Sequence, residues 1–169
     1  MNIDFANLQL QYQKYKTDID INIQVVLNKS NYIMGEEVHE LEQALEEFTG
    51  AKHAITCSSG TDALMLAMMA MGIQPGDEII TTPFTFIATA EAIALMKAKP
   101  VFVDIELDTF NINANLIEVA ITNKTKAIMP VSLYGQPADM GAIQSIANKH
   151  SLKVIIDGAQ SFGSSYNGK

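Results

Sequence analysis

The stretch GDEIITTPFTFIATAEAIALMKAKPVFVDI, residues 76–105, predicts one strand-helix-strand unit. Its two ends, GDEIIT and PVFVDI, are short apolar runs, and the residues between them have the length and composition of a helix. Short apolar strands joined by single helices are typical of parallel sheets that helices cover on both faces. The stretch therefore predicts an α/β fold.

The same alternation continues on both sides of this unit. The expected strands are HAITC (53–57), GDEIIT (76–81), PVFVDI (100–105), AIMPVSL (127–133) and LKVIID (152–157). The expected helices between them cover residues 61–71, 86–96, 115–121 and 140–150. These elements predict a mostly parallel sheet in one domain that covers residues 51–169.

Two helices are expected before this domain. Residues 11–27 mix isoleucine, valine and leucine with polar residues and predict an amphipathic arm. Residues 36–48 carry apolar side chains at helical spacing, with Glu36 and Glu37 in the first turn and Gly50 as a C-terminal stop. The arm and this helix predict a separate N-terminal segment, residues 1–50.

The composition of the 169 residues argues against several classes of protein. With 48% hydrophobic and 18% charged residues, the chain can bury one sizeable core. Its net charge of −8 opposes binding to nucleic acid or to anionic membranes. The sequence contains no evident membrane span or signal peptide, so a cytoplasmic location is expected. The single cysteine, Cys57, is expected to be a buried packing residue.

Polar residues after the strands are the candidate site, because ligands of such sheets bind outside the carboxyl ends of the strands. After HAITC, Gly60 allows an anion to approach the backbone, and the free amides of the helical turn at Thr61 point toward it. The alternative is a plain helix cap, in which Ser59 or Thr61 satisfies the helix and nothing binds. The segment lacks the lysine of a P-loop and the glycines of a dinucleotide fingerprint, which argues against ATP, GTP or NAD.

Aromatic and polar residues after two further strands add to this candidate site. Phe84 and Phe86 can stack on a planar ring, or both can belong to the core. Asp157 closes an apolar strand, where a carboxylate needs a cationic partner such as a protonated pyridine nitrogen, unless it caps a turn. Gln160 can donate to a phenolic oxygen or can hold its loop. Together with the anion-binding turn at Gly60 and Thr61, these residues predict a pyridoxal phosphate site. The three histidines lack the spacing of metal ligands, so no metal is expected.

Ordered motifs over nearly the whole chain resemble the DegT/DnrJ/EryC1/StrS family of nucleotide-sugar aminotransferases. They are GTDAL (60–64), PVSLYGQPADM (130–140) and IDGAQSFGSSYNGK (156–169). The resemblance implies the aspartate-aminotransferase fold (fold type I), a homodimer and pyridoxal phosphate as cofactor. It also implies transfer of an amino group from glutamate to a keto group on a nucleotide-linked sugar, in polysaccharide or deoxyaminosugar biosynthesis. PVSLYGQ with AQSFG looks most like members that act on a UDP-linked 3-keto-N-acetylhexosaminuronic acid.

The resemblance also implies a role for each site residue. Gly60 and Thr61 match the phosphate-binding motif, and Phe86 matches the aromatic residue that stacks on the cofactor ring. Asp157 matches the partner of the pyridinium nitrogen, and Gln160 matches the residue near the phenolic oxygen. Residues 51–169 then correspond to the first part of the cofactor-binding large domain.

Several parts of the family pattern, including a phosphate-binding serine, are expected outside this chain. The Schiff-base lysine and the small domain are expected beyond Lys169, so the chain alone is expected to be inactive and its exposed sheet edge to self-associate. One alternative is a non-catalytic, truncated or split subunit that only dimerises or binds cofactor. Another is a sugar dehydratase of the same family, which carries histidine in place of the lysine.

Overall fold

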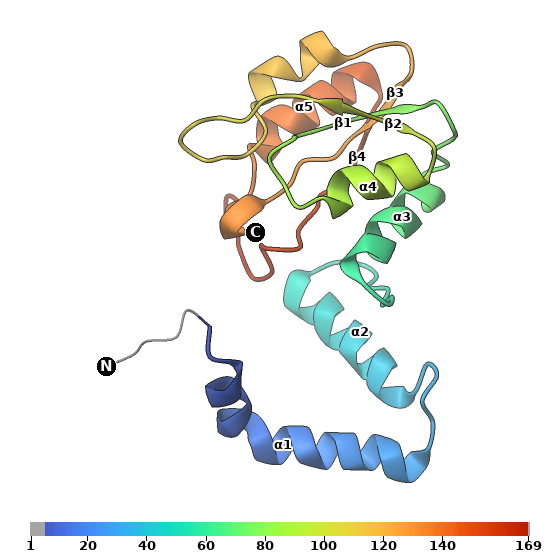
Figure 1. Cartoon of the computed structure of the whole chain (residues 1–169), viewed down its shortest axis with the longest axis vertical. Helices are drawn as coiled ribbons and strands as arrows, with labels where there is room; N and C mark the ends of the chain where they lie inside the picture. The colour runs from blue at the N-terminus through green and yellow to red at the C-terminus, as the bar shows by residue number, and fades with distance from the viewer. Residues whose placement is uncertain (1–5, 169) are drawn as a thin grey trace. The chain divides into compact units, whose positions relative to one another are not determined.

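The computed structural model describes residues 6–168, and the chain divides into two compact units at Thr56 and Cys57. The first unit contains the helices α1 (Leu8–Lys29) and α2 (Glu36–Thr49). The second unit contains a β-sheet with its helices (Figure 1). Both helices that the sequence predicts upstream of the sheet are therefore present.

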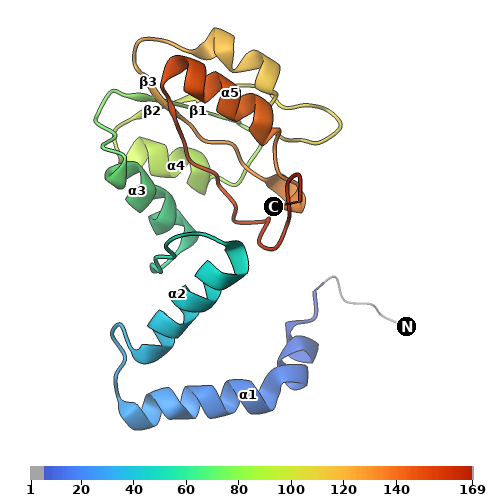
Figure 2. The same cartoon turned by 180° about the vertical axis from the view of Figure 1, so that it is seen from behind.

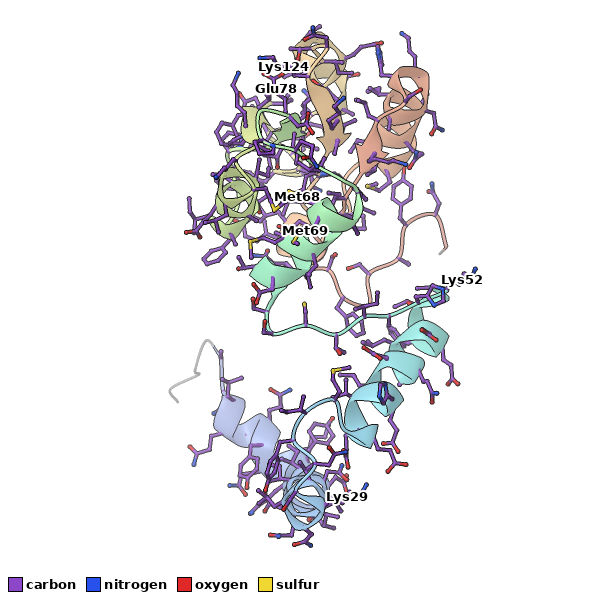
Figure 3. All side chains as sticks on the ribbon, turned by 90° about the vertical axis from the view of Figure 1, so that its right-hand side faces the viewer. Lys29, Lys52, Met68, Met69, Glu78 and Lys124 are labelled. Atoms are coloured by element: carbon purple, nitrogen blue, oxygen red, sulfur yellow. The ribbon has the colours of Figure 1, made fainter. Side chains whose placement is uncertain are left out.

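Helix α1 leaves its apolar side chains exposed. None of its residues is buried within the described part of the chain, and Leu10 and Ile21 are examples of apolar side chains on its surface. Lys29, labelled in Figure 3, pairs with Glu36 and Glu37 at 3.0 and 3.1 Å, so an ion-pair cluster joins the end of α1 to the start of α2. No helix within residues 6–168 has the length and apolar character that spanning a membrane requires.

The predicted strand HAITC is wrong. Residues 53–57 form no strand, because side chains of α2 satisfy their backbone donors. Glu46 accepts the N–H of Ala54 at 3.0 Å, and Glu42 accepts both the N–H and the hydroxyl of Thr56 at 2.9 Å. The two Thr56 donors hold the pKa of the Glu42 carboxyl below its ordinary value. Ile55, between these anchored residues, is exposed.

The second unit is built on a parallel sheet. Its strands are β1 (Glu78–Thr81), β2 (Lys99–Phe102), β3 (Thr125–Ile128) and β4 (Lys153–Val154). Its α-helices are α3 (Gly60–Ala70), α4 (Ala88–Leu95) and α5 (Met140–His150). The strands lie in the order β2-β1-β3-β4 and pair in parallel throughout. After β1 the chain adds β2 on one side of it and then crosses to add β3 and β4 on the other side. The direction in which strands are added therefore reverses between β1 and β3.

Two apolar cores cover the two faces of this sheet. Ile79 packs with α3 and α4, whereas Ile80 packs with α5, because successive side chains of a strand point to opposite faces. Figures 1 and 2 show α4 and α5 on opposite sides of the strands. Met68 of α3 is fully buried in the first core, whereas its neighbour Met69 is 60% exposed. Figure 3 labels both residues. The predicted arrangement, with helices on both faces of a parallel sheet, is confirmed.

Two 3-10 turns replace the helix predicted over residues 115–121. They are η1 (Ala114–Leu116) and η2 (Glu118–Ala120). Asn113 accepts the N–H of Asn115 at 3.0 Å, a local bond that competes with a continuous α-helix. The β-branched Ile117 between the turns is fully buried in the second core. Burial of that one side chain, rather than helical propensity, fixes the segment.

Glu78 is a charged side chain buried at the amino end of β1. Its carboxylate accepts the hydroxyl of Thr122 at 2.6 Å and pairs with Lys99 at 3.1 Å. The Thr122 hydrogen bond, followed by the Lys99 ion pair, holds the pKa of Glu78 below its ordinary value. Figure 3 labels Glu78 and Lys124, whose charge acts in the same direction. Because the folded state favours the ionised carboxyl, Glu78 links stability to pH.

We expect Glu78→Gln to make the free energy of unfolding depend less on pH in the acid range. The ionised carboxyl contributes its full stabilisation above the unfolded-state pKa of about 4.3. That contribution is lost as the pH falls through the lower folded-state pKa. Urea unfolding from pH 3 to pH 7 should therefore give a difference between wild type and Glu78→Gln that is largest at neutral pH and shrinks in acid. The exposed Glu40, changed to Gln, is the control, and an equal difference at every pH would contradict the assignment.

Candidate functional site

A cavity of about 220 Å³ lies in the second unit, beyond the carboxyl ends of the strands. Residues that follow β1, β3 and β4 line it, at the position where the strand order reverses. Ligands of open parallel sheets bind at such positions, where the loops on either side diverge. The five predicted site residues all line this cavity, namely Gly60, Thr61, Phe86, Asp157 and Gln160.

The N-terminus of α3 forms one wall of the cavity. Ser59 caps the helix by accepting the N–H of Asp62 at 3.1 Å, so the predicted capping role of Ser59 is confirmed. Within the described chain, the structure gives no hydrogen-bond acceptor to the amides of Gly60 and Thr61, which lie in the first helical turn. A Cβ atom added to Gly60 would meet no atom within 4 Å, so packing inside the chain does not require glycine there. Two free amides beside open space are suited to an anion.

The residues that precede this helix contribute no free charge to the cavity. The carboxylate of Asp62 accepts the hydroxyls of Ser58 and Ser59, which hold its pKa below the ordinary value. Cys57, which the sequence predicts to be buried, is exposed, and its Sγ lies 3.2 Å from the carbonyl oxygen of Ser59. The prediction is wrong because the preceding segment is not a sheet strand.

Asp157 also lines the cavity and is 8% exposed. Its backbone continues the parallel pairing past the end of β4, because its N–H donates to Pro130 at 2.9 Å and its carbonyl accepts from Ser132 at 3.0 Å. Its carboxylate accepts the hydroxyl of Thr89 at 2.7 Å and the N–H of Ala159 at 3.3 Å. Such donors stabilise a buried carboxylate, and a cationic partner stabilises it further. The cavity is the place where that partner can bind.

Thr89 is a site residue that the sequence analysis missed. It is fully buried in the first turn of α4, and its hydroxyl also lies 3.0 Å from the hydroxyl of Thr85, which lines the cavity. The only signal in the sequence is the spacing of the two threonines at the start of a helix. Nothing in the sequence relates Thr89 to a residue 68 positions away.

Gln160 is held by the turn that follows β3. Its Oε1 accepts the N–H of Tyr134 at 2.8 Å, in the turn η3 (Leu133–Gly135). Tyr134 and Gly135 both have left-handed backbone conformations, with φ of 55° and 87°. The C-terminal segment lies beside this turn in Figures 1 and 2, where Ser164 donates to the carbonyl of Gly135 at 2.5 Å. Because its oxygen is engaged, the amide group of Gln160 has its two N–H donors to offer.

Phe86 presents its ring to the cavity rather than to the core. It is 70% exposed and lines the cavity, so the interpretation of Phe84 and Phe86 as core residues is wrong. Phe84 instead packs against Phe110, with ring centroids 5.7 Å apart, and Phe110 packs edge-on against Tyr134 at 6.2 Å. An exposed aromatic face at the cavity wall is suited to a planar ring.

The cavity thus combines an anion-binding helix terminus, an exposed aromatic face, a buried carboxylate and an oriented amide. This set complements a planar, phosphorylated heteroaromatic cation. None of the described residues that line the cavity is a lysine. The prediction that a Schiff-base lysine follows Lys169 stays a prediction.

The sequence matches the DegT/DnrJ/EryC1/StrS aminotransferase family over residues 13–169. This chain belongs to that family. Its second unit is accordingly part of the large domain of the pyridoxal-phosphate-dependent transferase fold, type I. Membership of the DegT/DnrJ/EryC1/StrS family implies dependence on pyridoxal phosphate, in agreement with the residues of the cavity.

Several characterised relatives of this DegT/DnrJ/EryC1/StrS chain are nucleotide-sugar aminotransferases. UDP-2-acetamido-2-deoxy-3-oxo-D-glucuronate aminotransferase of Pseudomonas aeruginosa is 55% identical over 167 residues, which are 99% of this chain and 46% of that protein. The structure of S. venezuelae DesV in complex with a ketimine intermediate matches with a TM-score of 0.97 at 37% identity, over 99% of this chain and 45% of that one. Bacillus subtilis NtdA with bound cofactor PMP matches with a TM-score of 0.87 at 39% identity, over 89% and 34% of the two chains.

A dehydratase of the same fold is also similar to this family member. GDP-4-keto-6-deoxymannose-3-dehydratase, with a trapped PLP-glutamate geminal diamine, matches with a TM-score of 0.81 at 31% identity, over 87% of this chain and 40% of that one. This DegT/DnrJ/EryC1/StrS chain spans about half the length of the curated relatives it matches.

We expect Gln160→Leu to free the amide of Tyr134. Loss of the acceptor should speed hydrogen exchange of that amide by roughly 2- to 10-fold, the effect of one ordinary hydrogen bond. Gln160→Glu keeps an acceptor oxygen and should exchange at the wild-type rate. NMR-detected exchange measures both variants, with the amide of Gln136 in the same loop as the internal reference. Equal Tyr134 rates in Gln160→Leu and wild type would show that the contact does not form.

Proposed function

We propose that this chain forms part of an aminotransferase that uses pyridoxal phosphate to move an amino group onto a keto group of a nucleotide-linked sugar. The observation that carries the proposal is the convergence of Gly60, Thr61, Phe86, Asp157 and Gln160 on one cavity at the switch point of the sheet. The family to which the chain belongs, and the characterised relatives, support the same activity.

Each of these residues has a binding task that its surroundings support. The free amides of Gly60 and Thr61 hold the phosphate, assisted by the positive end of the α3 dipole. The exposed ring of Phe86 stacks on the cofactor ring. The Asp157 carboxylate accepts a hydrogen bond from the protonated ring nitrogen, and an N–H of Gln160 donates to the phenolic oxygen.

Pyridoxal phosphate, when bound, supplies an electron sink for chemistry at the amino-bearing carbon. The Asp157 carboxylate would favour a protonated ring nitrogen and would so maintain that property. Phe86 excludes water from one ring face, and Gln160 fixes the orientation of the ring. The proton at the reacting carbon is a task for a lysine general base, which the described cavity residues do not provide.

Finer features of the function are also proposed. Glutamate is the amino donor that the family resemblance implies, and the trapped glutamate adduct of the related dehydratase supports it. The 55% identity to the Pseudomonas aeruginosa enzyme supports a UDP-linked 3-keto-N-acetylhexosaminuronic acid as acceptor. Polysaccharide biosynthesis as its setting is what the family resemblance implies. A homodimer would cover the exposed apolar side chains of α1, such as Ile21. A cytoplasmic location stays a prediction from the sequence.

A second candidate is dehydration of a deoxysugar. The similarity to GDP-4-keto-6-deoxymannose-3-dehydratase favours it, because that protein shares the fold. The cavity residues serve both reactions equally, since both need a protonated cofactor ring. Residues after Lys169 decide between them: a lysine there supports the aminotransferase, and a histidine supports the dehydratase.

The first test is binding of pyridoxamine 5′-phosphate, which needs no Schiff-base lysine. We expect the chain to bind it in an absorbance or calorimetric titration. Asp157→Asn should weaken binding by roughly 10- to 100-fold, since a hydrogen bond to a charged group contributes about 1.5–3 kcal/mol. The exposed Asp108, changed to Asn, is the matched control and should bind like wild type. Equal affinity of wild type and Asp157→Asn would argue against the assignment of Asp157.

Gly60→Ala tests the phosphate cradle separately. The new methyl group meets no atom of the chain, so the free energy of unfolding should stay within about 1 kcal/mol of wild type. Gly60→Ala should weaken binding of pyridoxamine 5′-phosphate roughly tenfold or more. The added methyl group would enter the space between the backbone and the bound phosphate, and such overpacking costs about 1–3 kcal/mol. Pyridoxamine without its phosphate is the control ligand. Its affinity should not change, and an equal loss for both ligands would place the phosphate elsewhere.

A further inference from the structure

We propose that Thr89, with Thr85 behind it, positions the Asp157 carboxylate for the ring nitrogen of the cofactor; the inference rests on the proposed function. Thr89 does not line the cavity, whereas Thr85 and Asp157 do. Thr89 therefore acts through Asp157, and its role is that of a positioning residue.

The hydrogen bonds between these three side chains have a defined direction. An ionised carboxylate only accepts, so the single hydroxyl proton of Thr89 goes to Oδ2 of Asp157, 2.7 Å away. Because that proton is used, the Thr89 oxygen can only accept a hydrogen bond from Thr85. The hydroxyl of Thr85, 3.0 Å away, is therefore the donor. This series of hydrogen bonds, which we call the chain of donors, starts at Thr85 on the cavity wall. Thr85 donates to the buried Thr89, and Thr89 donates to Asp157.

This chain of donors distinguishes the two carboxylate oxygens. Oδ2 is held by the short Thr89 bond, whereas Oδ1 receives only the N–H of Ala159 at 3.3 Å, longer than an ordinary hydrogen bond. Oδ1 thus retains the capacity to accept a strong bond from a cationic N–H. Anchoring one oxygen of a buried carboxylate fixes the plane of the group and hence the direction in which the other oxygen accepts.

The position of Thr89 in α4 adds an electrostatic contribution. Thr89 lies in the first turn of the helix, and Ile87 at the N-cap supplies no side-chain cap. The carboxylate that Thr89 holds therefore lies beside a helix N-terminus, where the dipole favours a negative charge. Thr89 brings the charge of Asp157 to this terminus, across 68 residues of sequence.

Thr81 is a buried threonine with a packing role and serves as the comparison for Thr89. It is fully buried in β1, and its hydroxyl donates to the backbone carbonyl of Met129 at 2.8 Å. Both Thr81 and Thr89 satisfy a buried hydroxyl with one short bond. Only Thr89 donates to a side chain that lines the cavity, so the two residues form a matched pair for a test.

The test compares Thr89→Val, Thr89→Ser and Thr81→Val. Valine removes the hydroxyl and keeps the shape, whereas serine keeps the hydroxyl. Without ligand, the carboxyl ¹³C NMR signal of Asp157, assigned by its loss in Asp157→Asn, should move in Thr89→Val and stay in place in the other two variants. Titration with pyridoxamine 5′-phosphate should give a roughly tenfold weaker affinity for Thr89→Val and near wild-type affinity for Thr89→Ser and Thr81→Val. Urea unfolding of each variant separates lost stability from a change at the site.

The outcomes separate this inference from the proposed function. If wild type does not bind pyridoxamine 5′-phosphate, the proposed cofactor site fails, and the ligand-free carboxyl signal still decides whether Thr89 orients Asp157. If wild type binds and Thr89→Val matches Thr81→Val in both the signal and the affinity, the positioning role is overturned. If Thr89→Val does not fold, a wild-type signal and affinity in Thr89→Ala overturn the inference, and a shifted signal with weaker binding supports it.

Discussion

The parallel pairing of β1 with both β2 and β3 is the constraint on which the site depends. Parallel strands end at the same edge of a sheet, so the residues that follow β1, β3 and β4 meet there. Because the chain leaves β1 toward one neighbour and returns on its other side, the loops at this edge diverge and leave a crevice. The bond from Met129 N–H to the Ile80 carbonyl, at 2.7 Å, continues the β1 and β3 pairing up to that crevice.

Neutral and charged groups are separated within the cavity. Backbone amides at Gly60 and Thr61 face one part of it, and the carboxylate of Asp157 faces another. The chain has eleven basic residues, all lysine, and no arginine, and none of the described residues that line the cavity is basic. We therefore expect an anion in this cavity to be held by aligned peptide dipoles rather than by side-chain cations. The only full charge that the lining residues provide is negative, which favours a ligand with a cationic ring.

Much of this arrangement could be predicted from the sequence, for identifiable reasons. The apolar runs around Ile79 and Ile128 are buried on both faces and therefore read clearly as parallel strands. Helix α5 has the predicted bounds, residues 140–150, and the structure shows Asp139 capping its start and Lys149 and His150 in its last turn. Phe86, Asp157 and Gln160 could be selected because each follows a strand, whereas Gly60 and Thr61 could be selected because they open an apolar helix.

The errors arise where a long-range contact overrides local preference. HAITC has strand composition, yet its donors bond to Glu42 and Glu46 of α2. The buried Ile117 divides an expected helix into two turns. The bond between Thr89 and Asp157 joins residues that no local pattern relates. Sequence patterns therefore predicted which loops form the site, whereas the hydrogen bonds that orient its side chains required the structure.

The distance in sequence between Thr89 and Asp157 also has a consequence for folding. The turn at Ser59 and Gly60 closes with bonds between residues three or four apart and can form early. The carboxylate reaches the cavity only after the chain up to β4 has joined the sheet, and closing so long a loop is slow. A folding intermediate that lacks β4 would have a helix terminus able to bind a free phosphate, but no group to pair with a cationic ring. Affinity for the complete cofactor would therefore arise only once β4 has joined the sheet, and cofactor binding would stabilise that state relative to the earlier ones.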